Sequence, residues 1–551
     1  MDARLSSTLL EQLPRGVAMP DASTNRGEAG VTVRGLAMHV IAARLAGTLL
    51  TPALLVLSFP APDQGWLAWV ALVPLLLACR DLGLVAAFAL GLLSGVGMTF
   101  GLFHWMFEVS GFRVYHMLLG ALYLGLYPAA WCGGLALLTR SRLSLIVTAP
   151  ALWVALDYLR AHAGFLAFPW GTLAQSQHGN LAVLQVATLT GEYGVTCLVV
   201  MGSAAVAALI TRRAWRTAIA AGSLIALAHV GGALALAHPL AGSTLMVAIV
   251  QPSILISERS TASARAATLD RLERLTRAAA ATRPALIAWP ETAVRDLPKE
   301  PPLVARVQEL ARAIQTPLLV GASEFVKFAA REGDLPLVLH PRSYNAAYLV
   351  VPHAPLGEPY RKRLLVPFGE YLPLEGIIRW PTWFVPRVFA SVPGDGPRPF
   401  MLPDGTRFAV LICWENLFGA FVRPSVREGA HLLVQLTNDN WFGRTAASRQ
   451  HNLASVLRAV ENRVPVVIAS NTGPSQIIDP YGRIVAAAPG LFVEGIAAAE
   501  VPLGAGGTLY TRVGDLFAFA ALATLALGAM WRREGDSRAT GPRLRSRSRV
   551  D

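Results

Sequence analysis

The chain has 551 residues, of which 54% are hydrophobic and only 15% are charged, and its mean hydropathy is +0.46. Soluble domains carry about a quarter charged residues, so this composition excludes an ordinary water-soluble protein and indicates that lipid surrounds much of the chain. The net charge of +13 does not indicate nucleic-acid binding, because no lysine and arginine stripe interleaved with aromatic residues is present.

The first 36 residues are polar, contain four arginines and have no apolar run, so we expect no cleavable signal peptide. Seven apolar segments follow within residues 37–239, and an eighth occupies 513–531. Two charge-free runs of 26 residues, 82–107 and 114–139, are long enough to cross the ~30 Å hydrocarbon core. We therefore predict a polytopic α-helical membrane bundle.

Its spans, about eight in number, are expected near 40–59, 64–79, 83–105, 114–138, 143–159, 190–211, 217–237 and 513–531. Three of these segments are short enough to be buried core helices instead: 64–79, 143–159 and 513–531.

The arginines of the short connections indicate the orientation of the bundle. Short outside connections contain only Arg113 and Arg160. If the N-terminus is cytoplasmic, the inside connections contain Arg80, Arg140, Arg142, Arg212, Arg213 and Arg216, and seven more arginines follow Trp531. Because short basic loops stay in the cytoplasm, we predict that residues 240–512 lie outside and that residues 532–551 form a basic cytoplasmic tail.

The block 240–512 has a different pattern, in which short β-rich runs alternate with helical stretches. Such alternation predicts a layered α/β domain. We expect strands at 244–251, 285–289, 317–321, 345–351, 408–413, 432–437 and 466–470. We expect helices at 261–281, 302–315 and 446–463.

Three chemically useful residues of this block, Glu291, Lys362 and Cys413, follow apolar strand-like runs. Cys413 is the only thiol of the block, whereas the other cysteines lie in apolar stretches: Cys79, Cys132 and Cys197. Strand ends suit catalytic groups, because a rigid sheet positions a side chain that the following loop exposes.

The three residue types suit acyl transfer. A carboxylate such as Glu291 can remove the proton of a thiol, which makes the sulfur a nucleophile. An ammonium such as Lys362 can hold the oxyanion of a tetrahedral intermediate. Residue type alone leaves a plain alternative equally open, namely a solvated glutamate, a solvated lysine and a buried cysteine.

The neighbouring residues resemble motifs of the nitrilase (carbon–nitrogen hydrolase) superfamily, whose members use a Glu–Lys–Cys triad in this chain order. The chain is more specifically similar to the bacterial apolipoprotein N-acyltransferases, from its first membrane span to its last. The matching stretches of the outer block are Trp289-Pro290-Glu291, Tyr344-Asn345, Lys362 with Val366-Pro367-Phe368-Gly369-Glu370-Tyr371, Ile412-Cys413-Trp414-Glu415, Thr437-Asn438-Asp439, Trp441-Phe442-Gly443, Gln450-His451, Arg458-Ala459 and Asp479-Pro480-Tyr481-Gly482. Those of the membrane part are Phe168-Pro169-Trp170-Gly171 and Gly191-Glu192-Tyr193-Gly194.

The resemblance implies a nitrilase-like α-β-β-α sandwich, inserted before the last membrane span, and a role for each matching residue. Glu291 would be the general base, Lys362 the oxyanion-stabilising cation and Cys413 the nucleophile. Glu370 would support the lysine.

Beside the nucleophile, Trp414 and Glu415 would shape the entrance for the acyl chain and the substrate. Family members often have tyrosine at position 414, so the hydrogen bond of that hydroxyl is in question here. Trp441 and Phe442 lie on a loop that we expect near the lipid surface, although ordinary half-buried aromatic residues fit the pattern equally. The residues expected to contact substrate are Tyr344, Asn345, Asn438, Trp441 and Phe442.

No metal and no organic cofactor are expected. The eleven histidines lack metal-site spacing, and the thiol itself would carry the acyl group. His451 has a family-like position but no expected catalytic part. Asp157 and Glu192 lie near the outer ends of spans, where solvation at the interface is the favoured interpretation and a functional role is the alternative.

The resemblance also implies the substrates: a membrane phospholipid as acyl donor and the N-terminal amine of a diacylglyceryl-cysteine apolipoprotein as acceptor. This reaction would be the last step of lipoprotein maturation, in the bacterial inner (cytoplasmic) membrane. Two alternatives stay open. One is a membrane-anchored amidase or hydrolase that passes the acyl group to water. The other is a non-enzymatic transporter or receptor with an inert nitrilase-like ectodomain, which has no need to retain Glu291, Lys362 and Cys413 together.

Overall fold

The computed structural model describes residues 26–138, 143–211, 214–240, 242–255, 258, 261–326, 342–381, 383–385, 390–504 and 506–530. The chain divides into two compact units, residues 1–46 and 47–551. The first described helix, α2 (Arg26–Leu57), begins inside the segment 1–36 that the sequence assigns to a polar N-terminal segment. The expected tail 532–551 and four of the loop arginines lie outside the described residues: Arg140, Arg142, Arg212 and Arg213.

Apolar helices form the N-terminal part of the larger unit, up to Ala237, as the composition predicts. Their bounds are η1 (Gly65–Leu67), α3 (Ala68–Ala71), α4 (Val73–Ala78), α5 (Leu84–Phe103), η2 (His104–Glu108), α6 (Val114–Leu138), α7 (Leu145–Ala161), η3 (Gly164–Leu166), η4 (Gln175–Gln177), α8 (Leu181–Leu184), α9 (Ala187–Thr190), α10 (Glu192–Ile210) and α11 (Trp215–Ala237). Two further helices, α16 (Leu509–Val513) and α17 (Leu516–Met530), follow the sandwich domain.

Five helical segments among the described residues are long and apolar enough to cross a membrane: Met38–Leu57, Leu84–Glu108, Val114–Leu138, Glu192–Ile210 and Trp215–Ala237. The other three expected spans are shorter. The first is broken into η1, α3 and α4, while α7 has 17 residues and α17 has 15. These are the three segments for which the sequence left a buried helix open.

Helices α5 and α6 approach each other closely through small residues. A Cβ atom on Gly95 would lie 2.7 Å from the Cα atom of Gly125, and one on Gly91 would lie 2.5 Å from the carbonyl oxygen of Pro128. Such contacts between small residues are typical of helix pairs in membranes, where close van der Waals packing drives association.

The sandwich domain contains two sheets. One has the order β13-β1-β2-β4-β5-β6, with β3 paired to β4, and the other has the order β12-β11-β10-β9-β8-β7. The strands of the first sheet are β1 (Thr244–Gln251), β2 (Leu286–Ala288), β3 (Val294–Arg295), β4 (Leu318–Phe325), β5 (Ser343–Val350), β6 (Tyr360–Arg361) and β13 (Gly495–Pro502). Those of the second are β7 (Phe400–Met401), β8 (Arg407–Ile412), β9 (Leu432–Thr437), β10 (Val466–Ser470), β11 (Gln476–Ile478) and β12 (Ile484–Ala487).

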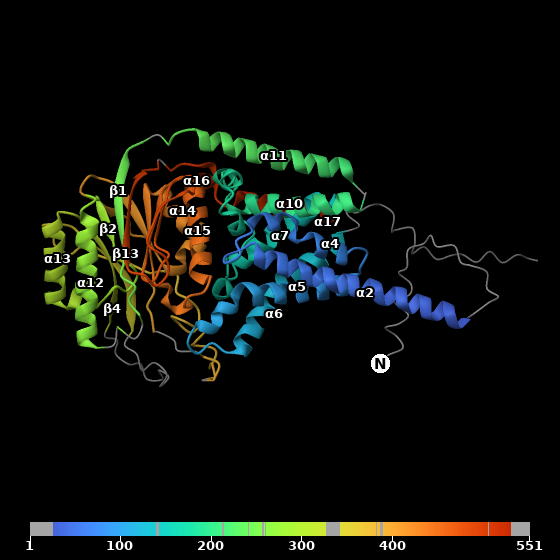
Figure 1. The fold of residues 1–551 in the computed structure, drawn as a ribbon, viewed down its shortest axis with the longest axis horizontal. Coiled ribbons are helices and arrows are strands. Elements are labelled where there is room, and N and C mark those ends of the chain that lie inside the picture. Colours follow the sequence, from blue (N-terminus) through green and yellow to red (C-terminus); the bar gives the residue numbers. More distant parts are fainter. Residues whose placement is uncertain are drawn as a thin grey trace, which may run out of the picture. The chain divides into compact units, whose positions relative to one another are not determined.

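Helices cover the outer face of each sheet, as Figure 1 shows. Helices α12 (Ala262–Ala280) and α13 (Pro301–Ile314) pack on the first sheet. Helices α14 (Gly419–Arg427) and α15 (Ala447–Asn462) pack on the second. A separate apolar core lies between the two sheets, so the predicted α-β-β-α sandwich is confirmed.

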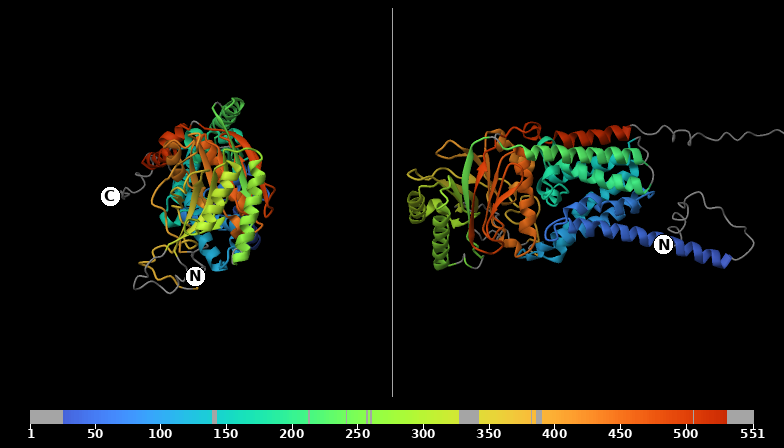
Figure 2. Two further views of the ribbon diagram at one scale, coloured as in Figure 1. Left: turned by 90° about the vertical axis from the view of Figure 1, so that its left-hand side faces the viewer. Right: turned by 45° about the horizontal axis from the view of Figure 1, so that its top comes forward.

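Helix α15 lies between the second sheet and the membrane helices, as Figure 1 and the right-hand view of Figure 2 show. Its Val456 and Val460 share one apolar cluster with Val183 of α8 and Val195 of α10. Because one side of α15 faces the sheet and the other faces apolar helices, nearly all of its residues are buried.

The seven expected strands and three expected helices are present with small shifts of their ends. The sequence interpretation did not include the short strands β3, β6, β7, β11 and β12, the longer strand β13, or α14. Most of these strands have two to four residues, too few for a periodic pattern to emerge.

Candidate functional site

The three residues singled out by the sequence follow strands of both sheets. Glu291 lies three residues after β2, and Lys362 directly follows β6. Cys413 directly follows β8 of the second sheet and opens the short helix η7 (Cys413–Leu417). Its backbone φ of +56° lies in the left-handed region, which turns the chain sharply between strand and helix.

Lys362 lies at the centre of the group and is only 1% exposed. Its Nζ donates a hydrogen bond of 2.9 Å to Oε1 of Glu370 and lies 3.9 Å from Oε1 of Glu291. Asn345 of β5 donates from Nδ2 to the same Glu291 oxygen at 2.5 Å, and its carbonyl oxygen accepts from the Lys362 backbone N–H at 2.8 Å. The structure therefore brings Glu291, Lys362, Glu370 and Asn345 together.

The charges of this group act on one another and on Cys413. Burial raises the pKa of the Cys413 thiol well above its ordinary value; the nearby Lys362 opposes this, and Glu291 adds to it. Burial also raises the pKa of Glu291, against the effect of Lys362. Burial alone would lower the pKa of Lys362, but Cys413, Glu370 and Glu291 outweigh it and raise that pKa. Burial therefore disfavours the Cys413 thiolate and makes the Glu291 carboxylate more basic, whereas the surrounding acidic groups favour the Lys362 ammonium.

Glu415 ties the loop after Lys362 to the turn that carries Cys413. Its side chain has no exposed surface and accepts from four donors. These are the backbone N–H groups of Ile412 (2.8 Å), Arg363 (2.7 Å) and Leu364 (3.1 Å) and the hydroxyl of Tyr360 (2.9 Å). A wholly buried side chain lines no opening, which corrects the expectation that Glu415 shapes a substrate entrance.

Trp414 makes a hydrogen bond of its own, which answers the question raised by the missing tyrosine hydroxyl. Its indole Nε1 donates to the carbonyl oxygen of Leu364 at 2.7 Å. The ring packs in an aromatic cluster that includes Phe103, Trp105 and Trp170 from the membrane part and that Cys413 contacts. Cys413 therefore packs both on this mixed cluster, which contains side chains of the bundle, and on the apolar core between the two sheets.

The residues expected to contact substrate have different surroundings. Tyr344 shares the strand face of Ala346 and Tyr348, which pack toward α12 and α13, and the guanidinium of Arg361 lies 4.6 Å from its ring centre. Because side chains alternate along a strand, Asn345 faces the space between the sheets and Tyr344 does not. The expected place of Tyr344 in the site is therefore corrected.

Asn438, Trp441 and Phe442 lie at and after the end of β9. Asn438 is 6% exposed and accepts a hydrogen bond from Asn471 at 3.0 Å. Trp441 is half-buried. The ring of Phe442 is half-buried and lies 4.7 Å from that of Trp105, so it packs against the membrane helices.

A buried pair close to this group, Asp439 and His451, was not selected from the sequence. Oδ1 of Asp439 lies 3.0 Å from Nδ1 of His451, and both side chains are 1% exposed. Asp439 is near enough to raise the pKa of Cys413. Both residues belong to matching motifs, so the signal was present, but nothing in the sequence shows that they meet.

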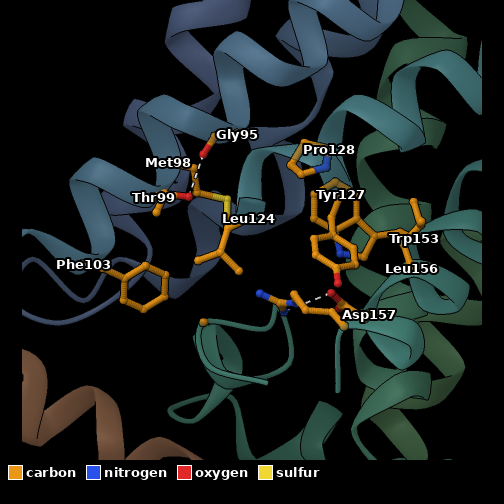
Figure 3. A pocket seen from close by; sticks show the side chains of 12 residues that line it. Gly95, Met98, Thr99, Phe103, Leu124, Tyr127, Pro128, Trp153, Leu156 and Asp157 are labelled. Carbon is orange, nitrogen blue, oxygen red and sulfur yellow. Dashed lines mark hydrogen bonds and ion pairs between the residues drawn. The ribbon is translucent and has the colours of Figure 1, made fainter. Parts of the chain in front are cut away.

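Asp157 and Glu192 are buried, at 8% and 6% exposure, so the favoured interpretation of interfacial solvation is wrong for both. Asp157 forms an ion pair of 3.0 Å with Arg160 beside a cavity of about 30 Å³. Figure 3 shows this cavity with Thr99, Tyr127 and Asp157 around it. Glu192 faces Arg458 of α15. Charged residues are paired when they leave water, and the partner of Glu192 is far away in the sequence.

Two family models match the chain. The carbon–nitrogen hydrolase model matches residues 246–509, and the model of the apolipoprotein N-acyltransferase N-terminal domain matches residues 52–205. A solved nitrilase-superfamily protein of Saccharomyces cerevisiae is 21% identical, with a TM-score of 0.37, over 50% of this chain and 97% of that one.

Full-length relatives match as well. The apolipoprotein N-acyltransferase of Geobacter metallireducens is 36% identical over 507 residues, which cover 87% of this chain and 94% of that protein. The one of Gloeobacter violaceus is 35% identical over 499 residues, which cover 86% and 91%. With both family models and full-length relatives matched along most of its length, the chain belongs to the apolipoprotein N-acyltransferase family of the nitrilase superfamily.

Proposed function

We propose that this membrane enzyme, an N-acyltransferase by family, transfers a fatty acyl group from a phospholipid to the N-terminal amine of a diacylglyceryl-cysteine apolipoprotein, through a thioester on Cys413. Lipoprotein N-acylation follows from the family. The donor, the covalent intermediate and the roles of single residues are what the proposal adds. The observation that carries it is the buried Lys362 ammonium, held between Glu370 and Glu291 and electrostatically coupled to the Cys413 thiol.

In the first half-reaction, Glu291 accepts the thiol proton while the sulfur attacks the ester carbonyl of the phospholipid. The Lys362 ammonium stabilises the resulting oxyanion. The C–O bond then breaks, and the lysophospholipid oxygen leaves with the proton from Glu291. Because burial raises the pKa of Glu291, its carboxylate accepts a proton more readily than an exposed glutamate does.

In the second half-reaction, the acceptor amine attacks the thioester carbonyl, and Glu291 receives an amine proton. Lys362 again holds the oxyanion. The C–S bond breaks, the amide is released, and the proton returns to the sulfur of Cys413. The chain itself supplies every proton donor and acceptor that the two steps need.

The surroundings of the thiol support an amine rather than water as acceptor. Phe103, Trp105 and Trp170 of the membrane part join Trp414 in the cluster against which Cys413 packs. Apolar walls favour a lipid chain and exclude water, which disfavours the hydrolase alternative. In this proposal the donor and the lipid-anchored acceptor reach the thiol from one bilayer.

The enzyme is proposed to reside in the bacterial inner membrane, with residues 240–512 on the extracytoplasmic side. The support is the charge asymmetry of the short connections, in which arginines gather on the opposite side.

The test of the intermediate uses purified enzyme and a phospholipid labelled in its acyl chain, without acceptor. The protein should carry one label, which neutral hydroxylamine releases as it does from thioesters. Cys413→Ala should carry none. The matched controls Cys79→Ala, Cys132→Ala and Cys197→Ala should label normally, because those cysteines lie in helices or helix ends of the membrane part.

A lipopeptide amine should then discharge the label far faster than water does. Label that persists in Cys413→Ala would overturn the nucleophile. Discharge by water at the rate found with amine would support the hydrolase instead.

A further inference from the structure

The membrane helix α10 begins at a buried ionic cluster shared with the sandwich domain. Glu192, its first residue, donates its backbone N–H to Oε1 of Glu461 on α15 at 2.9 Å. That N–H has no partner within its own helix, and a carboxylate is favoured there by the helix dipole. Glu461 thus fastens the start of α10 to α15, although the two residues are 269 positions apart.

Arg458 joins both carboxylates to the turn that carries Cys413. Its side chain has no exposed surface. Nη2 donates to Glu461 at 2.9 Å and lies 3.5 Å from Oε2 of Glu192, while Nε lies 2.8 Å from the second Glu461 oxygen as an ion-pair contact. Nη1 donates to the carbonyl oxygen of Leu417, the last residue of η7, at 3.3 Å.

The same helix holds η7 at a second point. Nδ2 of Asn416 donates to the carbonyl oxygen of His451 at 3.0 Å and to the hydroxyl of Ser455 at 2.9 Å. The nucleophile turn is therefore attached to α15, and α15 is attached to α10 through Glu461 and Arg458.

Core stability alone does not explain such a cluster. A buried ion pair or triad is often no more stable than apolar residues of similar size, because both charges lose their hydration. Its directional contacts instead fix one arrangement of the elements that meet there. In this chain those elements are a membrane helix and the turn after β8.

We propose that Glu192 and Arg458 are positioning residues, through which the first turn of α10 holds the η7 turn so that Cys413 stays aligned with Glu291 and Lys362. The membrane bundle thereby supports the geometry of the reacting groups. This inference rests on the proposed role of Cys413 as nucleophile.

The test compares two substitutions with the same loss of charge. Glu192→Gln keeps the shape of a side chain whose partner contacts the nucleophile turn. Asp157→Asn alters another buried ion pair of the membrane part, whose arginine contacts the carbonyl oxygen of Trp170 and not η7. For each variant, the rate constant of acyl-enzyme formation and the half-saturating phospholipid concentration are measured in single turnovers, with thermal unfolding alongside.

Glu192→Gln should lower the rate constant about tenfold or more, because a small misplacement of a reacting group slows the reaction strongly. The half-saturating phospholipid concentration should stay within about twofold of the wild-type value. Asp157→Asn should change the rate constant by less than about twofold, although its loss of thermal stability should be comparable to that of Glu192→Gln. In Arg458→Lys, the lysine cannot reach Glu192, Glu461 and the carbonyl oxygen of Leu417 together. Combining Arg458→Lys with Glu192→Gln should lower the rate constant no further than the more harmful single variant does.

Equal rate constants in Glu192→Gln and wild type, or equal losses in Glu192→Gln and Asp157→Asn, would overturn the inference. The two proposals fail in different ways. If wild-type enzyme carries no label on Cys413, the proposed nucleophile is refuted. If wild type is labelled normally and Glu192→Gln has the wild-type rate constant, only the positioning role is refuted.

Discussion

Lys362 keeps a full charge at 1% exposure because acidic and polar groups surround it. Glu370 accepts from its Nζ and also from the Val366 backbone N–H at 2.7 Å, so one carboxylate fixes both the ammonium and its loop. An ammonium is a compact point charge, whereas a guanidinium is a planar fork. This site therefore distinguishes lysine from arginine more strongly than a surface ion pair would.

We expect Lys362→Arg to lower the rate of acyl-enzyme formation by about 10²-fold or more, as removal of one oxyanion donor does. The larger, planar group cannot place its charge where Nζ stands. Single-turnover labelling measures this rate. Lys299→Arg is the matched control, because Lys299 forms a surface pair of 3.9 Å with Asp296 and its side chain is 48% exposed. Near-normal labelling by Lys362→Arg would assign the lysine a structural part only.

Among the helices, α15 carries the most buried polar groups of the site. The side chains of its Arg458, Glu461, His451 and Asn462 are fully or almost fully buried. Because these four side chains cannot turn toward water, a change at one face of the helix acts on the other face. Its charged residues are consequently sensitive to protonation.

Glu461 should make the stability of the protein depend on pH. It faces Arg458 on its own helix, Glu192 of α10, Tyr510 of α16 and Asp515 before α17. Burial raises its pKa to about 8; Arg458 opposes this, and Glu192 and Asp515 reinforce it. The unfolded carboxyl group titrates near ~4.3, so the folded protein binds this proton more tightly. The stabilisation that this proton contributes to the folded protein is complete below about pH 4. It is lost as the pH rises through the pKa of Glu461 in the folded protein.

The measurement is Tm in detergent as a function of pH, for wild type and Glu461→Gln. The wild-type Tm relative to that of Glu461→Gln should fall between roughly pH 5 and pH 8 and level off above. Glu309→Gln, an exposed change on α13, should follow the wild-type curve. A constant difference between wild type and Glu461→Gln across this range would contradict the expectation.

At the scale of the whole molecule, the sandwich domain is inserted between α11 and α17, so both of its ends join membrane helices. The turn between β11 and β12 also contacts the end of α11 through side chains. Tyr481 donates its hydroxyl to the carbonyl oxygen of His238 at 2.9 Å, and Arg483 donates to that of Leu236 at 3.0 Å. These contacts satisfy carbonyl groups at the end of α11.

The orientation can be tested with single thiols in a background where all four cysteines are replaced by alanine. Ala313→Cys lies exposed on α13, and Arg216→Cys lies exposed at the start of α11. In right-side-out vesicles, a membrane-impermeant maleimide should label Ala313→Cys directly and Arg216→Cys only after permeabilisation, because basic connections stay inside. Labelling of both before permeabilisation would contradict the proposed topology.

The sequence determined the membrane bundle, the layered domain and the residue types of the candidate site. Apolar run length and strand or helix periodicity are local properties, and motifs such as Trp289-Pro290-Glu291 are contiguous. The elements 244–251, 432–437 and 466–470 were predicted with the bounds that the structure has. Short strands such as β6 were not predicted, because two residues are too few to show the alternation of a strand.

Only the tertiary structure decided which polar residues meet. Tyr344 and Asn345 are adjacent in the chain, yet strand alternation sends them to opposite faces of the sheet. Glu192 was assigned to the interface from its place near the outer end of a span. Its partner Arg458 lies 266 positions later in the chain, on α15. Burial and ion pairing depend on such distant contacts, because a charge leaves water only where another element supplies its partner.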